Sequence, residues 1–145
     1  MKSDKILQLL IWFVILTALG LMLTAIFWLT HPYNPIEFKD KVLPVLNEKK
    51  QVKSGDYLLI SLDYCKSTNE IPLVTRTFAD GILYDTPIAP VSYKGTGCGK
   101  IVVQVYVPKA LPVGIYTLKN SYIYQVNPIR KLEVHIDTEQ FTIVK

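Results

Sequence analysis

The chain carries at residues 6–29 the stretch ILQLLIWFVILTALGLMLTAIFWL, which contains 24 residues and no charged side chain. A helix rises about 1.5 Å per residue, so one of this length crosses a hydrocarbon core about 30 Å thick. The stretch therefore predicts one N-terminal transmembrane α-helix. It divides the chain into a cytoplasmic tail (1–5), the helix (6–29), a membrane-exit linker (30–40) and one folded domain (41–145).

A cleaved signal peptide is the alternative interpretation of this segment. The apolar part of a signal peptide is usually about 7–15 residues long, and a small-x-small cleavage site follows it. Ala18–Leu19–Gly20 has that form, but nine more mostly apolar residues come after it. Trp28 lies at the far end of the stretch, where aromatic side chains suit the membrane interface. We therefore favour an uncleaved anchor.

The apolar stretch also has a face of small side chains. Thr17, Gly20 and Thr24 recur at helical spacing, and such faces let two membrane helices approach closely. They are candidates for a helix–helix contact that would make a homo-oligomer. The alternative is that Gly and Thr are simply common in membrane spans.

Charge and cysteine placement predict the orientation. Lys2 and Lys5 precede the apolar stretch and favour a cytoplasmic N-terminus, although Lys39 and Lys41 follow it. Both cysteines of the chain lie in the C-terminal part, and an even number of cysteines suits an oxidising compartment. We expect a single-pass protein of a bacterial inner membrane, with its C-terminal domain in the periplasm.

The region after the helix reads as β-structure. Apolar residues alternate with polar ones, and Gly, Pro and Asp-Gly turn signals separate the segments. About seven short strands in this length of chain predict a β-sandwich. The clearest strands are expected at Tyr57–Tyr64, Ile71–Ala79, Ile82–Tyr84, Lys100–Val107 (as a central strand), Gly114–Val126 and, by alternation, 132–136; Val42–Leu46 is expected at an edge because of Pro44.

One short stretch resembles a known family. Leu111–Leu118 (LPVGIYTL) places Gly114 and Tyr116 at the start of a late strand after a turn, which is similar to the tyrosine corner of immunoglobulin-like sandwiches. The resemblance implies an immunoglobulin-like fold with a bonded Tyr116 hydroxyl, and it implies no activity. Leu118 stands where an antibody domain has its second cysteine, and no Trp follows Trp28. The alternative is that Tyr116 is an ordinary strand aromatic.

In such a sandwich, Cys65 and Cys98 are expected to meet. Cys65 follows the strand Tyr57–Tyr64, and Cys98 precedes the strand Lys100–Val107. If these strands are antiparallel neighbours, the end of the first lies beside the start of the second, within reach of a disulfide. Two free thiols or a redox pair are the alternatives.

The sequence predicts neither a cofactor nor a metal. Membrane-anchored copper sandwiches need Cys, His and usually Met close together, whereas His31 and His135 are far apart. With His135 as the sole histidine of the domain a catalytic triad stays open, but there is no nucleophile elbow. Arg76, near Asp80 and Asp85, is interpreted as a surface ion pair, with a ligand clamp as the alternative. We expect no enzyme.

What remains is recognition. The net charge of +4 is scattered, with one small cluster at Lys49–Lys50–Lys53, so no nucleic-acid site is predicted. Tyr84 and Tyr93 lie near irregular connections and are candidate interface residues. We expect a non-catalytic module that binds an envelope protein or surface partner. The alternative is an accessory subunit of an envelope enzyme or transport complex. The overall design also resembles small bacteriophage accessory proteins.

Overall fold

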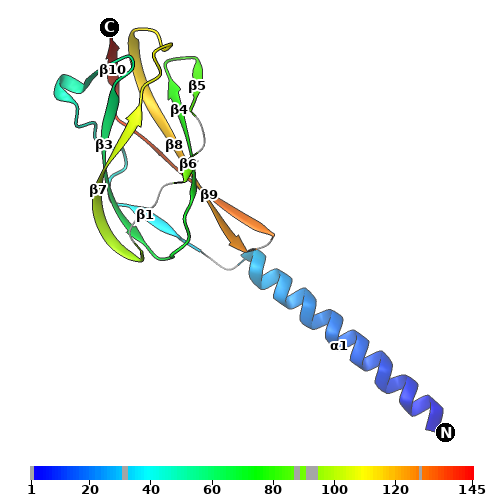
Figure 1. The fold of residues 1–145 in the computed structure, drawn as a ribbon. Coiled ribbons are helices and arrows are strands. Elements are labelled where there is room, and N and C mark those ends of the chain that lie inside the picture. Colours follow the sequence, from blue (N-terminus) through cyan, green and yellow to red (C-terminus); the bar gives the residue numbers. More distant parts are fainter. Residues whose placement is uncertain (1, 31–32, 87–88, 91–94, 128) are drawn as a thin grey trace. The chain divides into compact units, whose positions relative to one another are not determined.

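The structure is a computed structural model that describes residues 2–30, 33–86, 89–90, 95–127 and 129–145. The chain divides into two compact units. One contains residues 1–33 and 127–130, and the other contains residues 34–126 and 131–145. Figure 1 shows the order of the elements along the chain, and each unit is described by itself.

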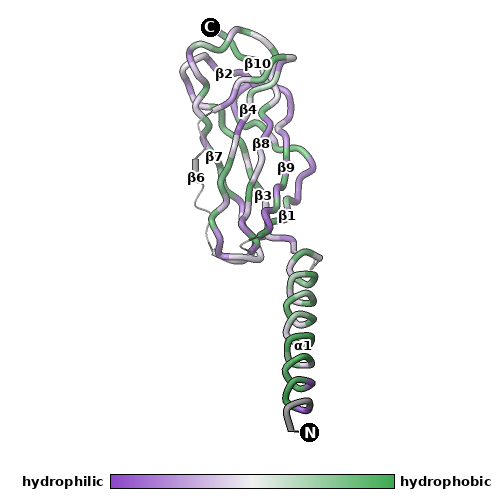
Figure 2. Tube along the Cα trace, turned by 90° about the vertical axis from the view of Figure 1, so that its right-hand side faces the viewer, coloured by the Kyte–Doolittle hydropathy of each residue, from purple (hydrophilic) through white to green (hydrophobic). Residues whose placement is uncertain are grey.

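The first unit is dominated by one long helix, α1 (Lys2–Thr30). Its stretch Lys5–Thr30 is long and apolar enough to span a membrane, and none of its most apolar window is buried in the protein. The tube in Figure 2 is hydrophobic along most of α1. A signal sequence near an N-terminus has the same properties. The prediction of an N-terminal apolar helix is confirmed.

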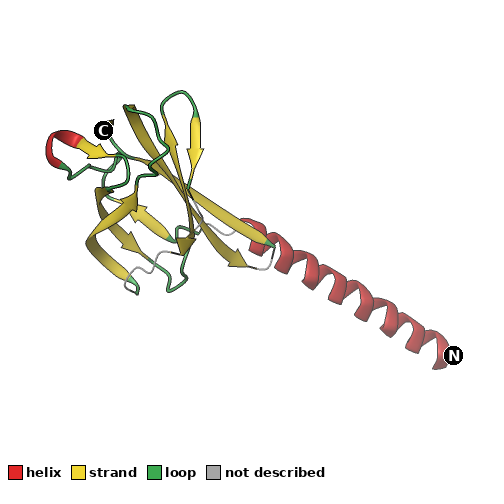
Figure 3. Cartoon of the chain, turned by 45° about the horizontal axis from the view of Figure 1, so that its top comes forward, coloured by secondary structure: helices red, strands yellow, loops and turns green. Residues whose placement is uncertain are grey.

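The second unit is built from β-strands, with one short 3-10 turn, η1 (Glu48–Lys50) (Figure 3). The strands form one sheet of order β1-β3-β7 and another of order β2-β10-β8-β4-β5, in which β6 also pairs with β4 and β9 with β8. Their bounds are β1 Ile36–Phe38, β2 Gln51–Lys53, β3 Tyr57–Lys66, β4 Leu73–Ala79, β5 Leu83–Asp85, β6 Ala89–Pro90, β7 Gly97–Tyr106, β8 Gly114–Asn127, β9 Arg130–Asp137 and β10 Phe141–Val144.

The core lies between the two sheets. Alternate residues of each strand point inward because the side-chain period of a strand is two. Both sheets contribute to one apolar cluster, and Phe38 of β1 contacts Tyr122 of β8 with ring centroids 5.1 Å apart. Fully buried members include Leu58, Ile60, Leu62, Val74, Phe78, Leu118, Tyr122 and Ile143. The prediction of a β-rich domain after the helix is confirmed.

The strand order differs from the predicted one at β7. The strand predicted at Lys100–Val107 is not central: β7 ends the three-stranded sheet and pairs with β3. Its dense β-branched residues reflect strand propensity, which edge strands share. The central place belongs to β8, which pairs with β4 on one side and with β9 and β10 on the other. Val42–Leu46 forms two isolated bridges, one from Leu43 to Thr138, which directly follows β9, and one from Val45 to Ile60 of β3.

Candidate functional site

The disulfide predicted between Cys65 and Cys98 is present. The two residues lie directly opposite each other on the antiparallel strands β3 and β7. The bond joins positions 33 residues apart, and on the chain-entropy model such a loop stabilises the fold by about 3–4 kcal/mol. It holds β7 to β3 at the end where this edge strand begins.

Tyr116, predicted as a tyrosine-corner residue, lies near the start of β8. The side chain is buried, and its hydroxyl donates a hydrogen bond to the carbonyl oxygen of Pro112 at 3.0 Å. Burial, followed by the nearby Asp80 carboxylate, raises the pKa of Tyr116 to about 12. A Cβ at Gly114 would lie 3.3 Å from the Tyr116 ring, so the glycine lets the ring pack closely against the backbone.

Of the two candidate interface tyrosines, Tyr84 lies among the described residues. Tyr84 is half-buried and packs on Tyr116, with ring centroids 6.2 Å apart. Part of its apolar surface is therefore already covered by the core. Tyr93 lies outside the described residues. Their role in an interface stays a prediction.

The small-residue face of α1 uses its hydroxyl groups within the helix. Thr17 donates to the carbonyl oxygens of Phe13 and Val14, and Thr24 donates to that of Gly20, each at 2.9 Å. These bonds satisfy both hydroxyls without a neighbour, so any contact through this face rests on close packing. The helix–helix contact stays a prediction.

His135 is paired with a serine, but the arrangement differs from a catalytic triad. Ser121 Oγ lies 2.7 Å from His135 Nδ1, and Glu133 Oε1 lies 3.9 Å from the same nitrogen. In a triad the carboxylate holds one imidazole nitrogen while the other faces the nucleophile. Here both neighbours share Nδ1, so the carboxylate does not orient Nε2 toward Ser121.

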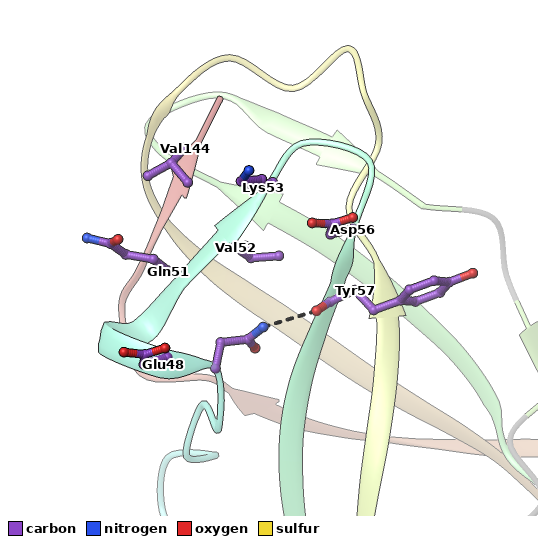
Figure 4. Close-up of a pocket in the computed structure, with 8 residues that line it drawn as sticks. Glu48, Gln51, Val52, Lys53, Asp56, Tyr57 and Val144 are labelled. Carbon is purple, nitrogen blue, oxygen red and sulfur yellow. Dashed lines mark hydrogen bonds between the residues drawn. The ribbon is translucent and has the colours of Figure 1, made fainter.

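One hollow of about 350 Å³ lies beside the turn that precedes β2. Figure 4 shows Glu48, Lys53, Asp56 and Tyr57 around it, together with the bond from Asn47 Nδ2 to the carbonyl oxygen of Tyr57. The Tyr57 ring points away from Glu48 and Gln51 in Figure 4 and packs on Tyr106, so the residues that line the hollow do not converge on one point. The sequence offered little signal here beyond its small cluster of lysines.

The same turn carries backbone strain. Lys49 and Lys50 both have positive φ, at 51° and 52°, a region that non-glycine residues rarely adopt. Glu139 holds the turn from across the domain, because one carboxylate oxygen accepts from Val45 N and the other from Lys50 Nζ. These two hydrogen bonds, the one from Lys50 first, lower the pKa of Glu139.

A second pair of hollows lies where β4 and β5 approach β7. One, of about 400 Å³, is lined by β4, Asp85 and Thr86, and the other, of about 250 Å³, by Arg76, Thr86, the end of β7 and Pro108. The interpretation of Arg76 as a surface ion pair is wrong. It is 8% exposed and makes no ion pair among the described residues, because it lies on the inner face of β4.

Comparisons with known proteins add little. No family model and no curated protein matches the chain. Among solved structures, a Niemann-Pick type C2 protein from Japanese carpenter ant is similar with 12% sequence identity and a TM-score of 0.47, over 75% of this chain and 98% of that one. At this level of similarity no conclusion about fold or function follows.

Proposed function

We propose that the chain is a single-pass protein of a bacterial inner membrane that presents an immunoglobulin-like sandwich in the periplasm. There the domain recognises a protein partner or surface without catalysing a reaction. The observation that carries this proposal is α1, whose side chains from Lys5 to Thr30 are all exposed. An uncovered apolar surface of this size needs lipid or protein around it.

The periplasmic placement is supported by the disulfide and by the N-terminal charges. A bond between Cys65 and Cys98 persists in an oxidising compartment and is rare in the cytosol. Lys2 and Lys5 favour retention of the short N-terminal tail on the cytoplasmic side. Both features agree with a helix that is retained as an anchor.

The immunoglobulin-like assignment rests on two antiparallel-rich sheets and on the Tyr116 hydroxyl bond to Pro112. The chain also departs from antibody domains. Its disulfide joins two strands of one sheet, whereas the antibody bond links the two sheets. The likeness is therefore one of architecture. The sandwich itself supplies a rigid surface for recognition.

Recognition is supported by an exposed face on β3 and β7, which we call the tyrosine face and define as Tyr57, Val102 and Tyr106. Tyr57 and Tyr106 are cross-strand partners whose rings lie 5.7 Å apart, and the three residues are 54%, 57% and 45% exposed. Tyrosine combines apolar area with a polar tip and is enriched at protein interfaces. β7 is also an edge strand, so a partner can pair with its backbone.

Membrane anchoring is tested with the full chain expressed in a bacterium. We expect it to stay in the membrane pellet after alkaline carbonate washing, with the intact mass of the uncleaved chain. Externally added protease should digest the domain in spheroplasts but not in intact cells. A soluble periplasmic product that begins after Gly20 would contradict the anchor and support the signal peptide.

Recognition is tested by placing a photo-crosslinking amino acid at Tyr106 in living cells, with Lys119 on β8 as the matched exposed control. We expect one discrete cross-linked species from position 106 and none from position 119. The absence of a species at 106 would count against the tyrosine face. A stable larger complex that survives detergent extraction would favour the alternative, an accessory subunit of an envelope enzyme or transport complex.

Self-association through α1 is a separate part of the proposal. Gly20 has open space where a Cβ would be, so a second helix can approach it. We expect Gly20→Leu to abolish chemical cross-linking between copies in membranes if the small-residue face is used. Unchanged cross-linking would assign any oligomer to another surface.

A further inference from the structure

The inner face of β4 carries a charge in the middle of an apolar layer. Val74 and Phe78 are completely buried, and Arg76 between them is 8% exposed. Arg76 lies opposite Asn120 on the neighbouring strand β8. Figure 1 shows β4 and β8 side by side. Asn120 is 1% exposed, so two polar side chains sit side by side within the sandwich.

The protein leaves both groups incompletely bonded. Within the described part of the chain, Arg76 Nε is buried and has no hydrogen-bond partner, and Asn120 Oδ1 is in the same state. The amide nitrogen of Asn120 is used, since it donates to the carbonyl oxygens of Leu118 and Ile136. A buried charge without a partner is costly, so a counter-charge is missing from this position.

Asp85 is the carboxylate that lines the same hollow as Arg76, but it does not neutralise the guanidinium. Its Oδ1 accepts a hydrogen bond from the Thr77 hydroxyl at 2.7 Å, and no ion pair joins Asp85 to Arg76. Thr86 is occupied as well, because its backbone N–H and its hydroxyl both donate to the Arg76 carbonyl oxygen. Neither neighbour therefore accepts a hydrogen bond from Arg76 Nε.

Arg76 lines space that a ligand can fill. Arg76 and Thr86 are shared by two hollows of about 400 and 250 Å³. The smaller one is lined from the opposite sheet by Gln104, Val105 and Tyr106 of β7 and by Pro108. Val105 points inward from β7, whereas Gln104 and Tyr106 alternate to its exposed face. The hollow thus combines one cation with apolar walls from Val105 and Pro108, and a mostly apolar lining with few polar groups is typical of a small-ligand site.

We propose that Arg76 binds a carboxylate that enters between β4 and the edge strand β7. The planar fork of a guanidinium matches the two oxygens of a carboxylate, and Val105 and Pro108 suit a small apolar body attached to it. The carboxylate belongs either to a free small molecule or to the C-terminus of a peptide. This inference does not depend on membrane placement or on the tyrosine face.

The binding test uses the full chain in neutral detergent micelles in Tris chloride, which contains no competing carboxylate or phosphate. Isothermal titration compares benzoate with its neutral analogue benzamide, and N-acetyl-phenylalanine with its amide. Benzoate binding supports a small-molecule source, and binding of N-acetyl-phenylalanine alone supports a peptide C-terminus. In both cases we expect the neutral analogue to bind at least tenfold more weakly. Failure of both carboxylates to bind overturns the proposal.

The variants identify the residue. Arg76→Met should lose at least tenfold in affinity, Arg76→Lys should retain part of it, and Lys119→Met, at an exposed position of β8, should bind as the wild type does. The carboxylate that binds should raise the thermal midpoint of the wild type and leave that of Arg76→Met unchanged. Equal affinity of wild type and Arg76→Met overturns the proposal.

A purely structural role for Arg76 makes the opposite stability prediction. If the site is a ligand site, Arg76→Met without ligand should melt at or above the wild-type temperature, because an unpaired buried charge is removed. If Asp85 is the true counter-ion, Arg76→Met and Asp85→Asn should each lower the midpoint, and the double variant should lower it no further. That second pattern overturns the proposal.

Discussion

The inner faces of β3 and β4 pack into the same core, but on β4 a charged residue interrupts the apolar run. On β3, Leu58, Ile60 and Leu62 follow one another at alternate positions, and all are fully buried. On β4, Val74 and Phe78 are equally buried, but Arg76 separates them. Burial of each apolar side chain stabilises a fold by about 1.5–3 kcal/mol, whereas burial of an unpaired charge destabilises it. The apolar positions of β3 therefore stabilise the sandwich, whereas Arg76 on β4 does not, which fits the proposed role in ligand binding.

Truncation on the β3 face is expected to have the largest effect on stability. Ile60→Ala removes apolar volume that the second sheet cannot refill, so the free energy of unfolding should fall by about 2–5 kcal/mol. Urea unfolding of the full chain in micelles, followed by near-ultraviolet circular dichroism of the domain's tyrosines, measures it. Val102→Ala on the exposed face of β7, where the side chain is 57% exposed, should change the value by less than about 0.5 kcal/mol. Equal effects at the two positions would remove the distinction.

The disulfide reinforces the same sheet from its edge. Replacing both Cys65 and Cys98 by Ala should lower the free energy of unfolding by about 2–4 kcal/mol, because the loop between β3 and β7 is no longer closed in the unfolded chain. The measurement is urea unfolding of the double variant beside the oxidised wild type. A wild type treated with reductant should behave as the double variant does. Full stability after reduction would show that β3–β7 pairing needs no covalent support.

Tyr116 is a buried polar residue whose hydroxyl has a hydrogen-bond partner, whereas Arg76 Nε has none. Tyr116→Phe leaves the ring packing and removes the hydrogen bond to Pro112, so we expect a loss of about 1–2 kcal/mol. Tyr106→Phe, on the tyrosine face, is the control and should be nearly neutral. A stability loss at Tyr106 equal to that at Tyr116 would mean that the corner contributes nothing particular.

The smallest expected effect is a pH dependence at Glu139. Its pKa is lowered in the folded protein, so its contribution to stability is complete above the unfolded value, which the ordinary glutamate pKa of about 4.3 approximates. The contribution is lost as the pH falls through the lowered folded value. Glu139→Gln should therefore be less stable than the wild type near neutral pH, and the difference should shrink in acid. An unchanged difference across urea titrations from neutral to acid pH would contradict this assignment.

Parts of the β-domain were predictable because their signals are local. The alternation Leu58, Ile60, Leu62 sets a strand whatever its neighbours are, and the strand found there, β3, extends the predicted one by two residues to Lys66. Arg76 shares the parity of Val74 and Phe78, which was a signal for its inward direction. A charged residue is nevertheless expected at the surface by default, so the ion-pair interpretation was wrong.

The parts that were not predictable depend on partners far away in the chain. Glu139 reaches Val45 and Lys50, which are 94 and 89 residues away, and no local pattern announces such bonds. The edge position of β7 follows from the strand order. Its amino-acid composition does not reveal that position, because edge strands share the preference of central strands for β-branched residues. The hollow at Arg76 needs β4 and β7 from different sheets, so it exists only once the sandwich has formed.

The sequence by itself determined the apolar helix and the β-rich class of the domain. These features follow from hydrophobic length and side-chain period, which are local properties of the chain. Cys65 and Cys98 were expected to meet only if their strands were antiparallel neighbours, and the pairing of β3 with β7 brings them together. The tertiary structure decided which strand lies at an edge and which polar groups are buried without a partner. Both features depend on the free energy of the whole packed domain. The apolar residues of β3 stabilise the fold enough for it to tolerate an unpaired arginine on β4.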